Sequence, residues 1–249
     1  MENITECLDY ENFTIKYVYL DPGTRSFFEN YLTESAESPD IEIRVTQEFM
    51  RQNHWLIGEY EQSQAFLEFQ CLMLATGNEL LLHDRALFHG ASFIWQGKAW
   101  IFTAPSGTGK TTQLRRWHRI LKKEVTIING DKPMLESRAD GSIWVYSSPW
   151  RGKEKLGCPG LCAPLGGIVY LEQGTNNTIR RLSPREAVLP LMTEFVSYPE
   201  SVSQISGQAK FLRKMLDAVP VWKLVNIGDE DAALLTMIEL QRYMEVIHD

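Results

Sequence analysis

One short segment near the middle of the chain constrains the fold more than any other. The apolar run Ala99–Phe102 is followed almost at once by Ala104–Thr111, which has the sequence Ala-Pro-Ser-Gly-Thr-Gly-Lys-Thr. When an apolar strand ends in a glycine-rich loop and continues as a helix, backbone N–H groups converge on one point. Such a concave set of donors at a helix N-terminus binds anions. The segment therefore predicts an α/β domain with a phosphate-binding loop.

The residue types in this loop indicate nucleotide chemistry. Gly107 and Gly109 let the backbone turn closely around phosphate groups, and Lys110 adds a positive charge for the β- and γ-phosphates. The hydroxyl of Thr111 can ligate Mg²⁺. Ala104 replaces the usual first glycine at a position where small size is the requirement. The residues of this segment that we expect to bind the nucleotide are Ser106, Gly107, Thr108, Gly109, Lys110, Thr111 and Thr112.

Composition and charge argue against several classes of partner. The 249 residues contain 25 Lys and Arg against 32 Asp and Glu, and this net charge of −7 argues against nucleic acid as the main partner. No apolar run is long enough to span a bilayer, and Met1–Asn12 is too acidic and polar for a secretory signal. The four cysteines are few and scattered, which fits a reducing compartment. We therefore expect a cytoplasmic protein without a nucleic-acid or membrane partner.

The distribution of apolar residues predicts an α/β fold with a mixed sheet, because extended and helical segments do not alternate strictly. Expected extended segments are Phe13–Tyr19, Ile41–Val45, Trp55–Tyr60, Leu87–Trp95, Ala99–Phe102, Val125–Ile128, Ser142–Ser147, Gly166–Leu171, Asn177–Leu182 and Val221–Val225. Expected helices are Pro22–Thr33, Gln62–Thr76, Thr111–Leu121, one that starts at the N-cap Ser183, Gln208–Ala218 and Glu230–Val246. We expect residues 1–80 to form a small α+β region packed on a nucleotide-binding core of residues 81–249.

A candidate catalytic carboxylate follows the strand after the loop helix. Val125–Ile128 ends at Asn-Gly-Asp, so Asp131 lies where phosphoryl-transfer enzymes hold Mg²⁺ or the attacking hydroxyl. Asn-Gly-Asp is also a sequence that favours a turn, and the alternative is that Asp131 caps a turn. We expect Asp131 to be a metal ligand and the proton acceptor.

His89 is the second candidate catalytic residue. It opens the strand that precedes the loop strand, and Gln96-Gly97-Lys98 predicts a hairpin between these two strands. A hairpin returns the start of its first strand to the end of its second strand. We therefore expect His89 to approach the phosphate end of the loop. The alternative is a histidine whose hydrogen bonds are satisfied within the core.

The order of these motifs resembles a known kinase family. The chain is similar to the catalytic core of HPr kinase/phosphorylase in the order of its elements. That order is His-Gly, a strand, a glycine turn, a second strand, small-x-Ser-Gly-x-Gly-Lys-Thr, a helix, a strand and Asp. The sequence Ser-Gly-Thr-Gly-Lys-Thr-Thr also resembles the corresponding loop of ATP-dependent phosphoenolpyruvate carboxykinase, which shares that fold. The chain looks especially like the small HPr-kinase-like proteins of peptide-modification systems, including kinases of lasso-peptide precursors. The segments that carry this likeness are Asn129–Pro133, Ser148–Lys153, Pro164–Leu171 and Val219–Leu224.

This resemblance implies a fold and a set of roles. The fold would be a P-loop-containing mixed sheet of the HPr kinase / phosphoenolpyruvate carboxykinase type with helices on its faces. Lys110 and Thr111 would bind phosphate and Mg²⁺, while Asp131 would be the catalytic carboxylate that His89 orients. The chain has one aspartate where bacterial HPr kinases carry a pair, and no segment matches their phosphorylase signature. HPr kinases form hexamers, so the resemblance also implies a homo-oligomer.

Two cations around a glycine form a further candidate site. In Ser148–Lys153, Arg151 offers a planar guanidinium and Lys153 a point charge, which suit phosphates or a peptide carboxylate. The alternative is a solvated basic turn. Cys158 and Cys162 lie close in sequence, but no second ligand pair has zinc-like spacing, so we expect a loop without metal there.

These features together predict an ATP- and Mg²⁺-dependent kinase that transfers the γ-phosphate to a hydroxyl. The expected acceptor is a serine of a protein or precursor peptide. Two alternatives stay open, namely a small-molecule kinase or carboxykinase-like enzyme, and a non-catalytic nucleotide-binding regulatory protein. A carboxykinase would need further basic residues and a second metal site, which the chain does not clearly show. The presence of Lys110, Thr111, Asp131 and His89 together argues against a regulatory protein, while the missing second aspartate keeps that alternative open.

Overall fold

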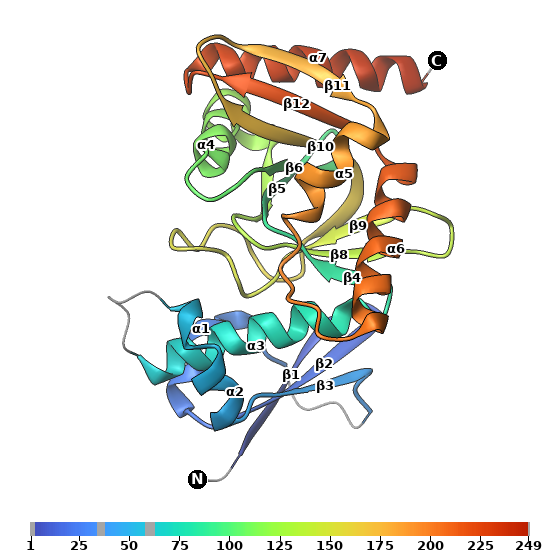
Figure 1. The fold of residues 1–249 in the computed structure, drawn as a ribbon. Helices are drawn as coiled ribbons and strands as arrows, with labels where there is room; N and C mark the ends of the chain where they lie inside the picture. The colour runs from blue at the N-terminus through green and yellow to red at the C-terminus, as the bar shows by residue number, and fades with distance from the viewer. Residues whose placement is uncertain (1–2, 34–37, 58–62, 249) are drawn as a thin grey trace.

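Two β-sheets of different size organise the chain. The computed structural model describes residues 3–33, 38–57 and 63–248. The smaller sheet belongs to the N-terminal region and the larger sheet to the remainder, with helix α3 (Gln64–Leu80) between them (Figure 1). The chain is therefore mixed α/β, as the sequence predicts.

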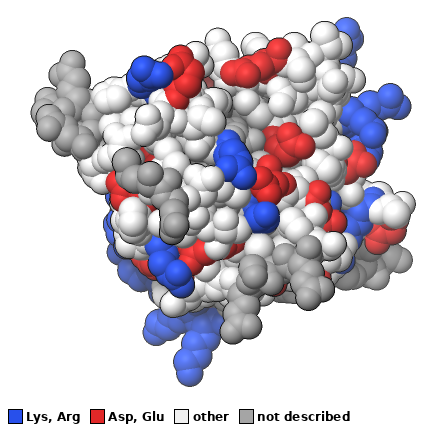
Figure 2. Space-filling model, turned by 90° about the horizontal axis from the view of Figure 1, so that it is seen from below, with Lys and Arg blue, Asp and Glu red and all other residues white. Residues whose placement is uncertain are grey.

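The N-terminal region is built on a three-stranded sheet. Its strands are β1 (Ile4–Tyr10), β2 (Phe13–Tyr19) and β3 (Ile41–Arg44). Strand β2 pairs antiparallel with β1 and parallel with β3. The short helices of this region are η1 (Pro22–Thr24), α1 (Arg25–Phe28), η2 (Glu29–Tyr31), α2 (Gln47–Gln52) and η3 (His54–Leu56). Figure 2 shows that basic and acidic side chains are interspersed on the face seen from below.

The larger sheet has nine strands in the described part of the chain. They are β4 (Arg85–Leu87), β5 (Gly90–Trp95), β6 (Lys98–Thr103), β7 (Thr126–Asn129), β8 (Met134–Ser137), β9 (Ile143–Tyr146), β10 (Cys162–Gln173), β11 (Thr178–Leu182) and β12 (Val221–Asn226). Their order is β4-β8-β9-β10-β6-β5-β7, and β12 pairs with β10 and β11. Strand β10 is parallel to β6 and β12 but antiparallel to β9. The sheet is therefore mixed.

Helices cover both faces of the larger sheet. They are α4 (Lys110–Leu121), with the short η4 (Lys122–Glu124), α5 (Pro184–Met192), α6 (Val202–Ala218) and α7 (Glu230–His248). Successive residues of a strand point to opposite faces, so Trp100 and Phe102 pack with α4 and α7, whereas Ile101 packs with α5 and α6. Burial of each such apolar side chain stabilises the fold by roughly 1.5–3 kcal/mol. Within the described residues no helix is long and apolar enough to cross a membrane.

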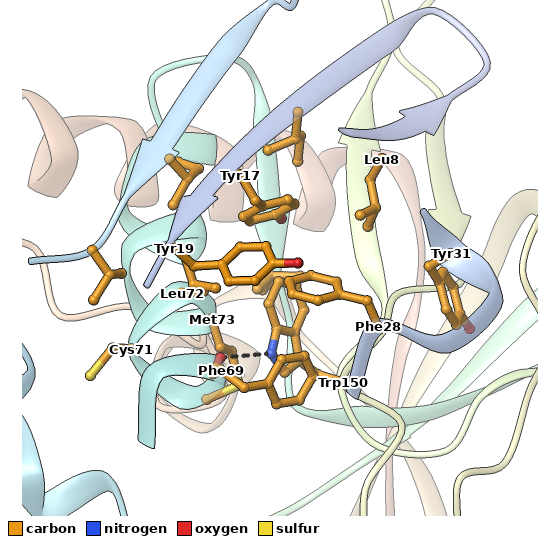
Figure 3. Close-up of a cluster of buried hydrophobic side chains, with 14 of the residues drawn as sticks. Leu8, Tyr17, Tyr19, Phe28, Tyr31, Phe69, Cys71, Leu72, Met73 and Trp150 are labelled. Carbon is orange, nitrogen blue, oxygen red and sulfur yellow. Dashed lines mark hydrogen bonds between the residues drawn. The ribbon is translucent and has the colours of Figure 1, made fainter. Parts of the chain in front are cut away.

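A cluster of buried aromatic residues joins the N-terminal region to the core. Figure 3 shows Tyr17, Phe28 and Phe69 of the N-terminal region around Trp150, which belongs to the core. Trp150 is 3% exposed, and its indole N–H donates to the carbonyl of Phe69 at 3.3 Å. The chain around Trp150 is therefore held in place by the N-terminal region.

Most of the expected elements are present, with three kinds of exception. The strand expected at Trp55–Tyr60 is wrong where the structure describes it, because His54–Leu56 forms the 3-10 helix η3, and residues 58–62 lie outside the described residues. The helix expected at Pro22–Thr33 is divided into short pieces, since Glu29 has a φ of +49°. Strands β1, β4 and β8 were not expected. Helix α3 ends at residue 80, and the division into an N-terminal region of residues 1–80 and a nucleotide-binding core of residues 81–249 stays a prediction.

Candidate functional site

The loop between β6 and α4 forms the first part of the site. Gly107 has a φ of +80° and Gly109 a φ of +112°, in the left-handed region that favours glycine. A Cβ at either position would meet no atom within 4 Å, so backbone conformation rather than crowding requires glycine here. Gly109 is the N-cap of α4, and no side chain in the described ranges caps this helix. The N–H groups at its start are therefore available to an anion.

Lys110 lies folded back against this loop. It is 6% exposed, and its ammonium donates to the carbonyls of Ala104 at 2.7 Å and Pro105 at 3.3 Å. Burial lowers the pKa of Lys110, while the carboxylates of Glu194 and Asp131 partly oppose this effect. Lys110 forms no ion pair within the described chain, so its charge is not neutralised by a carboxylate in contact with it.

Asn129 builds the turn that follows β7. Its side-chain oxygen accepts from the backbone N–H groups of Asp131 and Lys132, both at 2.8 Å. Its amide nitrogen donates to the carbonyl of Ser148 at 2.9 Å. The Asp131 carboxylate contacts instead the imidazole of His89 at 3.5 Å and the ammonium of Lys132. The turn-capping interpretation therefore fits Asn129, and the Asp131 side chain faces other ionisable groups.

His89 lies between two carboxylates. Its Nδ1 is 2.9 Å from Oε2 of Glu194, and its Nε2 is 3.5 Å from Oδ1 of Asp131. Glu194 follows α5 and has a side chain that is 3% exposed, and its backbone carbonyl also accepts from the His89 N–H at 2.7 Å. A hydrogen bond at one imidazole nitrogen fixes the orientation of the other nitrogen. Glu194 therefore directs His89 toward Asp131.

The backbone around His89 is fixed by its neighbours. The N–H of Gly90 donates to the carbonyl of Asp131 at 2.8 Å, and the carbonyl of His89 accepts from the Thr103 hydroxyl at 2.7 Å. A Cβ at Gly90 would lie 2.6 Å from a methyl carbon of Ile101, so only glycine allows this approach of β5 to β6. The hairpin therefore places His89 beside Thr103, the residue at which β6 ends and the loop begins.

The charges of this group depend on one another. Burial acts to raise the pKa of Asp131, but the hydrogen bond from His89 and the charge of Lys132 outweigh it and lower the pKa to about 2. Burial acts to lower the pKa of His89, but its hydrogen bonds to Asp131 and Glu194 outweigh it and raise the pKa above 6.5. Asp131 is therefore fully ionised at neutral pH, and the two carboxylates make His89 easier to protonate than a free imidazole.

The His89–Asp131 pair is expected to make the free energy of unfolding depend on pH. Because the pKa of His89 is raised, its contribution is complete below 6.5 and is lost as pH rises through the folded-state pKa. Because the pKa of Asp131 is lowered, its contribution is complete above 3.8 and is lost as pH falls toward about 2. Both contributions are present between these limits. Urea unfolding at about pH 5.5 and about pH 8 measures how much free energy of unfolding is lost as His89 is deprotonated.

Wild type should lose more free energy of unfolding between these two pH values than His89→Gln, which cannot be protonated. His118→Gln, at an exposed position of α4, is the matched control and should follow wild type. An equal loss in wild type and in His89→Gln would contradict the pairing.

One cavity of about 590 Å³ brings the loop and this cluster together. Of the residues predicted from the sequence, those that line it are His89, Ser106, Thr111, Asp131, Arg151 and Lys153. The segment after α5 closes another side through Thr193, Phe195 and Val196. The volume lies in the range of roughly 300–1,000 Å³ that is usual for small-molecule sites.

The remaining predicted residues lie on another side of the loop or within it. A hollow of about 440 Å³ is lined by Gly107, Thr108, Gly109 and Thr112, together with Arg116 and the chain around Gly174 and Gly228. Arg116 donates to the carbonyl of Gly228 across this hollow. Lys110 lines neither cavity because its side chain is buried against the loop.

The oxygen donors of the site suit a magnesium ion held jointly with phosphate. Thr111 and Asp131 line the same cavity. In the part of the chain that the structure describes, no group of three or more His, Cys, Asp or Glu could hold a metal by itself. Mg²⁺ usually binds through one or two carboxylates plus the phosphates of the substrate. The donor set therefore fits Mg²⁺ that arrives with a nucleotide.

Arg151 and Lys153 differ in how far their charges are already paired. The guanidinium of Arg151 contacts Glu29 of the N-terminal region and donates to the carbonyl of Gly157 at 3.0 Å, and its side chain is 10% exposed. Lys153 is exposed and makes no ion pair or hydrogen bond to any described residue. Arg151 therefore joins the two regions, and Lys153 has a free charge. A ligand contact by either residue stays a prediction.

Three contributors to the site do not emerge from the sequence analysis. Glu194 is 105 residues from His89 along the chain, and no local motif marks it. Lys132 follows Asp131 directly, but a neighbouring charge alone does not indicate a contact. Asn129 could have been found, because Asn-Gly-Asp is a turn sequence in which the first side chain commonly bonds to the backbone two residues on.

Comparisons with known proteins give distant similarity to solved structures. The chain matches no family model, and it matches no curated protein. Among solved structures, the HPr(Ser) kinase/phosphatase from Coxiella burnetii is similar over 66% of this chain and 99% of that chain. The sequence identity is 9% and the TM-score is 0.38. At this level of similarity, no activity or substrate is transferred to this chain.

Proposed function

We propose that this chain is an ATP- and Mg²⁺-dependent phosphotransferase that transfers the γ-phosphate to a hydroxyl, with a serine of a protein or precursor peptide as acceptor. One observation carries the proposal: Ser106 and Thr111, from the glycine loop and the helix that it starts, line one cavity together with the half-buried, ionised carboxylate of Asp131. The loop suits phosphate groups and the carboxylate suits a hydroxyl. Phosphoryl transfer requires these two functions to be adjacent.

The loop and the start of α4 would hold the nucleotide. The N–H groups released by the left-handed Gly107 and Gly109 would bind phosphate oxygens, and Lys110 would neutralise part of their charge. The ammonium of Lys110 already lies at the loop carbonyls, so its charge is placed before the ligand binds. Thr111 and Asp131 would hold Mg²⁺ together with phosphate oxygens. When bound, the ion offsets the negative charge of the transferring group.

Asp131 would hold the acceptor hydroxyl and receive its proton. The bond from γ-phosphorus to the bridging oxygen breaks, the bond to the acceptor oxygen forms, ADP leaves, and the proton passes to Asp131. A carboxylate with a pKa of about 2 is a weak base. In the loose transition state of this reaction, position and charge matter more than basicity. His89 would keep the carboxylate oriented, and the buried Glu194 would keep His89 in place.

The experiment that tests this proposal is incubation of the purified chain with γ-labelled ATP, Mg²⁺ and a library of serine-containing peptides, followed by mass spectrometry. A gain of one phosphate on serine is the expected result. A parallel reaction offers free hydroxyl metabolites, and transfer to these alone would replace the peptide acceptor by a small molecule. Binding of ATP without any transfer would leave a regulatory nucleotide-binding protein. Absence of ATP binding would overturn the proposal entirely.

A further inference from the structure

A second cavity lies beside the catalytic one, where the N-terminal region meets the core. Its volume is about 330 Å³, and it shares Asp131, Lys132 and the segment Arg151–Lys153 with the catalytic cavity. Gly152 makes the dividing wall thin, because a Cβ there would lie 3.0 Å from the Cβ of Asp131. Both cavities therefore border the same carboxylate.

Aromatic side chains of the N-terminal region form the apolar wall of this second cavity. Phe27, Phe66, Phe69 and Met73 line it. The ring of Phe27 lies 5.1 Å from that of Phe69 and 5.5 Å from that of Phe66, and Phe69 stacks on Trp150 at 5.5 Å. Figure 3 shows Phe69, Met73 and Trp150 within the packed cluster that joins the two regions. The wall is therefore preorganised by the packing of the fold.

The charged side of the cavity has one cation that is not neutralised. Arg151 and Lys155 both pair with Glu29, the latter at 2.6 Å. Lys153, in contrast, is exposed and has no partner among the described residues. A ligand in this cavity would therefore meet an apolar wall and one free positive charge.

The nucleotide is a poor candidate for this cavity. No residue of the glycine loop or of α4 lines it, so the phosphate-binding groups do not face it. The cavity does border Asp131, the group that would hold the acceptor hydroxyl. Its position and its lining therefore suit the part of the acceptor that flanks the reacting hydroxyl.

We propose that this cavity binds the acceptor peptide next to its reacting serine. An apolar side chain beside the serine would pack against Phe27, Phe66 and Met73, and an acidic group of the peptide would pair with Lys153. The N-terminal region thereby becomes part of the acceptor site and selects among peptides. This inference rests on the proposed function, because the serine is placed at Asp131.

Two series of synthetic serine peptides test the inference at saturating ATP. The first series carries Gly, Leu or Phe at the residue before or after the serine. Wild type should prefer Leu or Phe to Gly by about tenfold or more in kcat/KM, the discrimination that a hydrophobic pocket gives. Phe66→Ala should lose most of this preference and keep the KM for ATP. Phe49→Ala is the matched control, since Phe49 is also partly buried in the N-terminal region but does not line the cavity.

The second series varies the charge of the peptide next to the serine. The substitution that tests it is at Lys153, which is exposed and lies outside the packed aromatic cluster. Peptides with Asp near the serine should be better substrates than those with Lys, and Lys153→Glu should reverse this order. If wild type phosphorylates peptides without any preference for neighbouring residues, the inference fails and the proposed function stands. If no peptide is phosphorylated, both the inference and the peptide acceptor of the proposed function fail.

Discussion

Replacement of Asp131 by asparagine is expected to leave ATP binding close to that of wild type and to reduce phosphoryl transfer by about two to four orders of magnitude. Asparagine keeps the size of the side chain, but it cannot accept a proton or contribute a full charge to bound Mg²⁺. The change also removes one of the two carboxylates that flank His89. The pKa of His89 should therefore fall in the variant, which NMR titration of the imidazole can measure.

Calorimetric titration with ATP and Mg²⁺ and transfer from labelled ATP separate the two effects of this substitution. Asp217→Asn is the matched control, because Asp217 is an exposed carboxylate near the end of α6, and it should leave both binding and transfer unchanged. Transfer at the wild-type rate by Asp131→Asn would show that the carboxylate serves only as an ionic partner of His89 and Lys132.

Strongly periodic segments of the fold could be predicted from the sequence. In α4, Leu114 and Trp117 recur at helical spacing and both are buried, while Arg115 and His118, the residues that follow them, are exposed. The N-cap assigned to Ser183 is confirmed by a capping box with Glu186. In such segments the local pattern and the tertiary packing favour the same structure.

Other parts of the fold depend on partners that are distant in sequence. Strand β1 buries Glu6 at 8% exposure, and this acidic residue in the core is paired with Arg25 and Tyr19. Strands β4 and β8 have three and four residues, which is too short for a period of two to be recognised. Pairing partners, and not local pattern, define these elements.

Strand β10 shows why the sheet topology could not be predicted. The sequence predicts only Gly166–Leu171 as extended, because Pro164 interrupts the pattern on the N-terminal side of that segment. In the structure Pro164 pairs opposite Trp144 of β9. Gly167 is required where it lies, since a Cβ there would be 2.6 Å from the ring of Trp222. The one strand therefore has β9, β6 and β12 as partners, an arrangement without a local signature.

The residues of the candidate site also differ in whether a local sequence pattern predicts them. The loop and Asp131 each follow an apolar strand, and a local pattern is sufficient to propose them. Glu194 lies beside His89 because the segment after α5 pairs with the chain around Phe88, through the bridge between Phe195 and Phe88 and neighbouring backbone hydrogen bonds. The acidic partner of His89 is therefore set by the topology, which no local sequence pattern indicates.

Replacement of Lys110 by alanine is expected to weaken ATP binding or turnover by tenfold or more, at least about 1.4 kcal/mol. Lys110 is the one residue of the glycine loop that carries a charge, and its ammonium is buried at the loop carbonyls. Alanine removes this charge but also leaves space beside the loop. Lys110→Met removes the charge and keeps most of the volume, so a similar loss in both variants would assign the effect to the charge.

Stability measurements distinguish a lost phosphate contact from a damaged loop. Saturating ATP and Mg²⁺ should raise the Tm of wild type, because a ligand that binds only the folded state stabilises it. Lys110→Ala and Lys110→Met should lose most of this rise, while the Tm without nucleotide reports any structural damage. Lys123→Ala, at an exposed lysine just after α4, should keep the full rise. If ATP stabilises both Lys110 variants as it does wild type, and turnover is also unchanged, the loop does not bind the phosphates and the proposed kinase loses its nucleotide site.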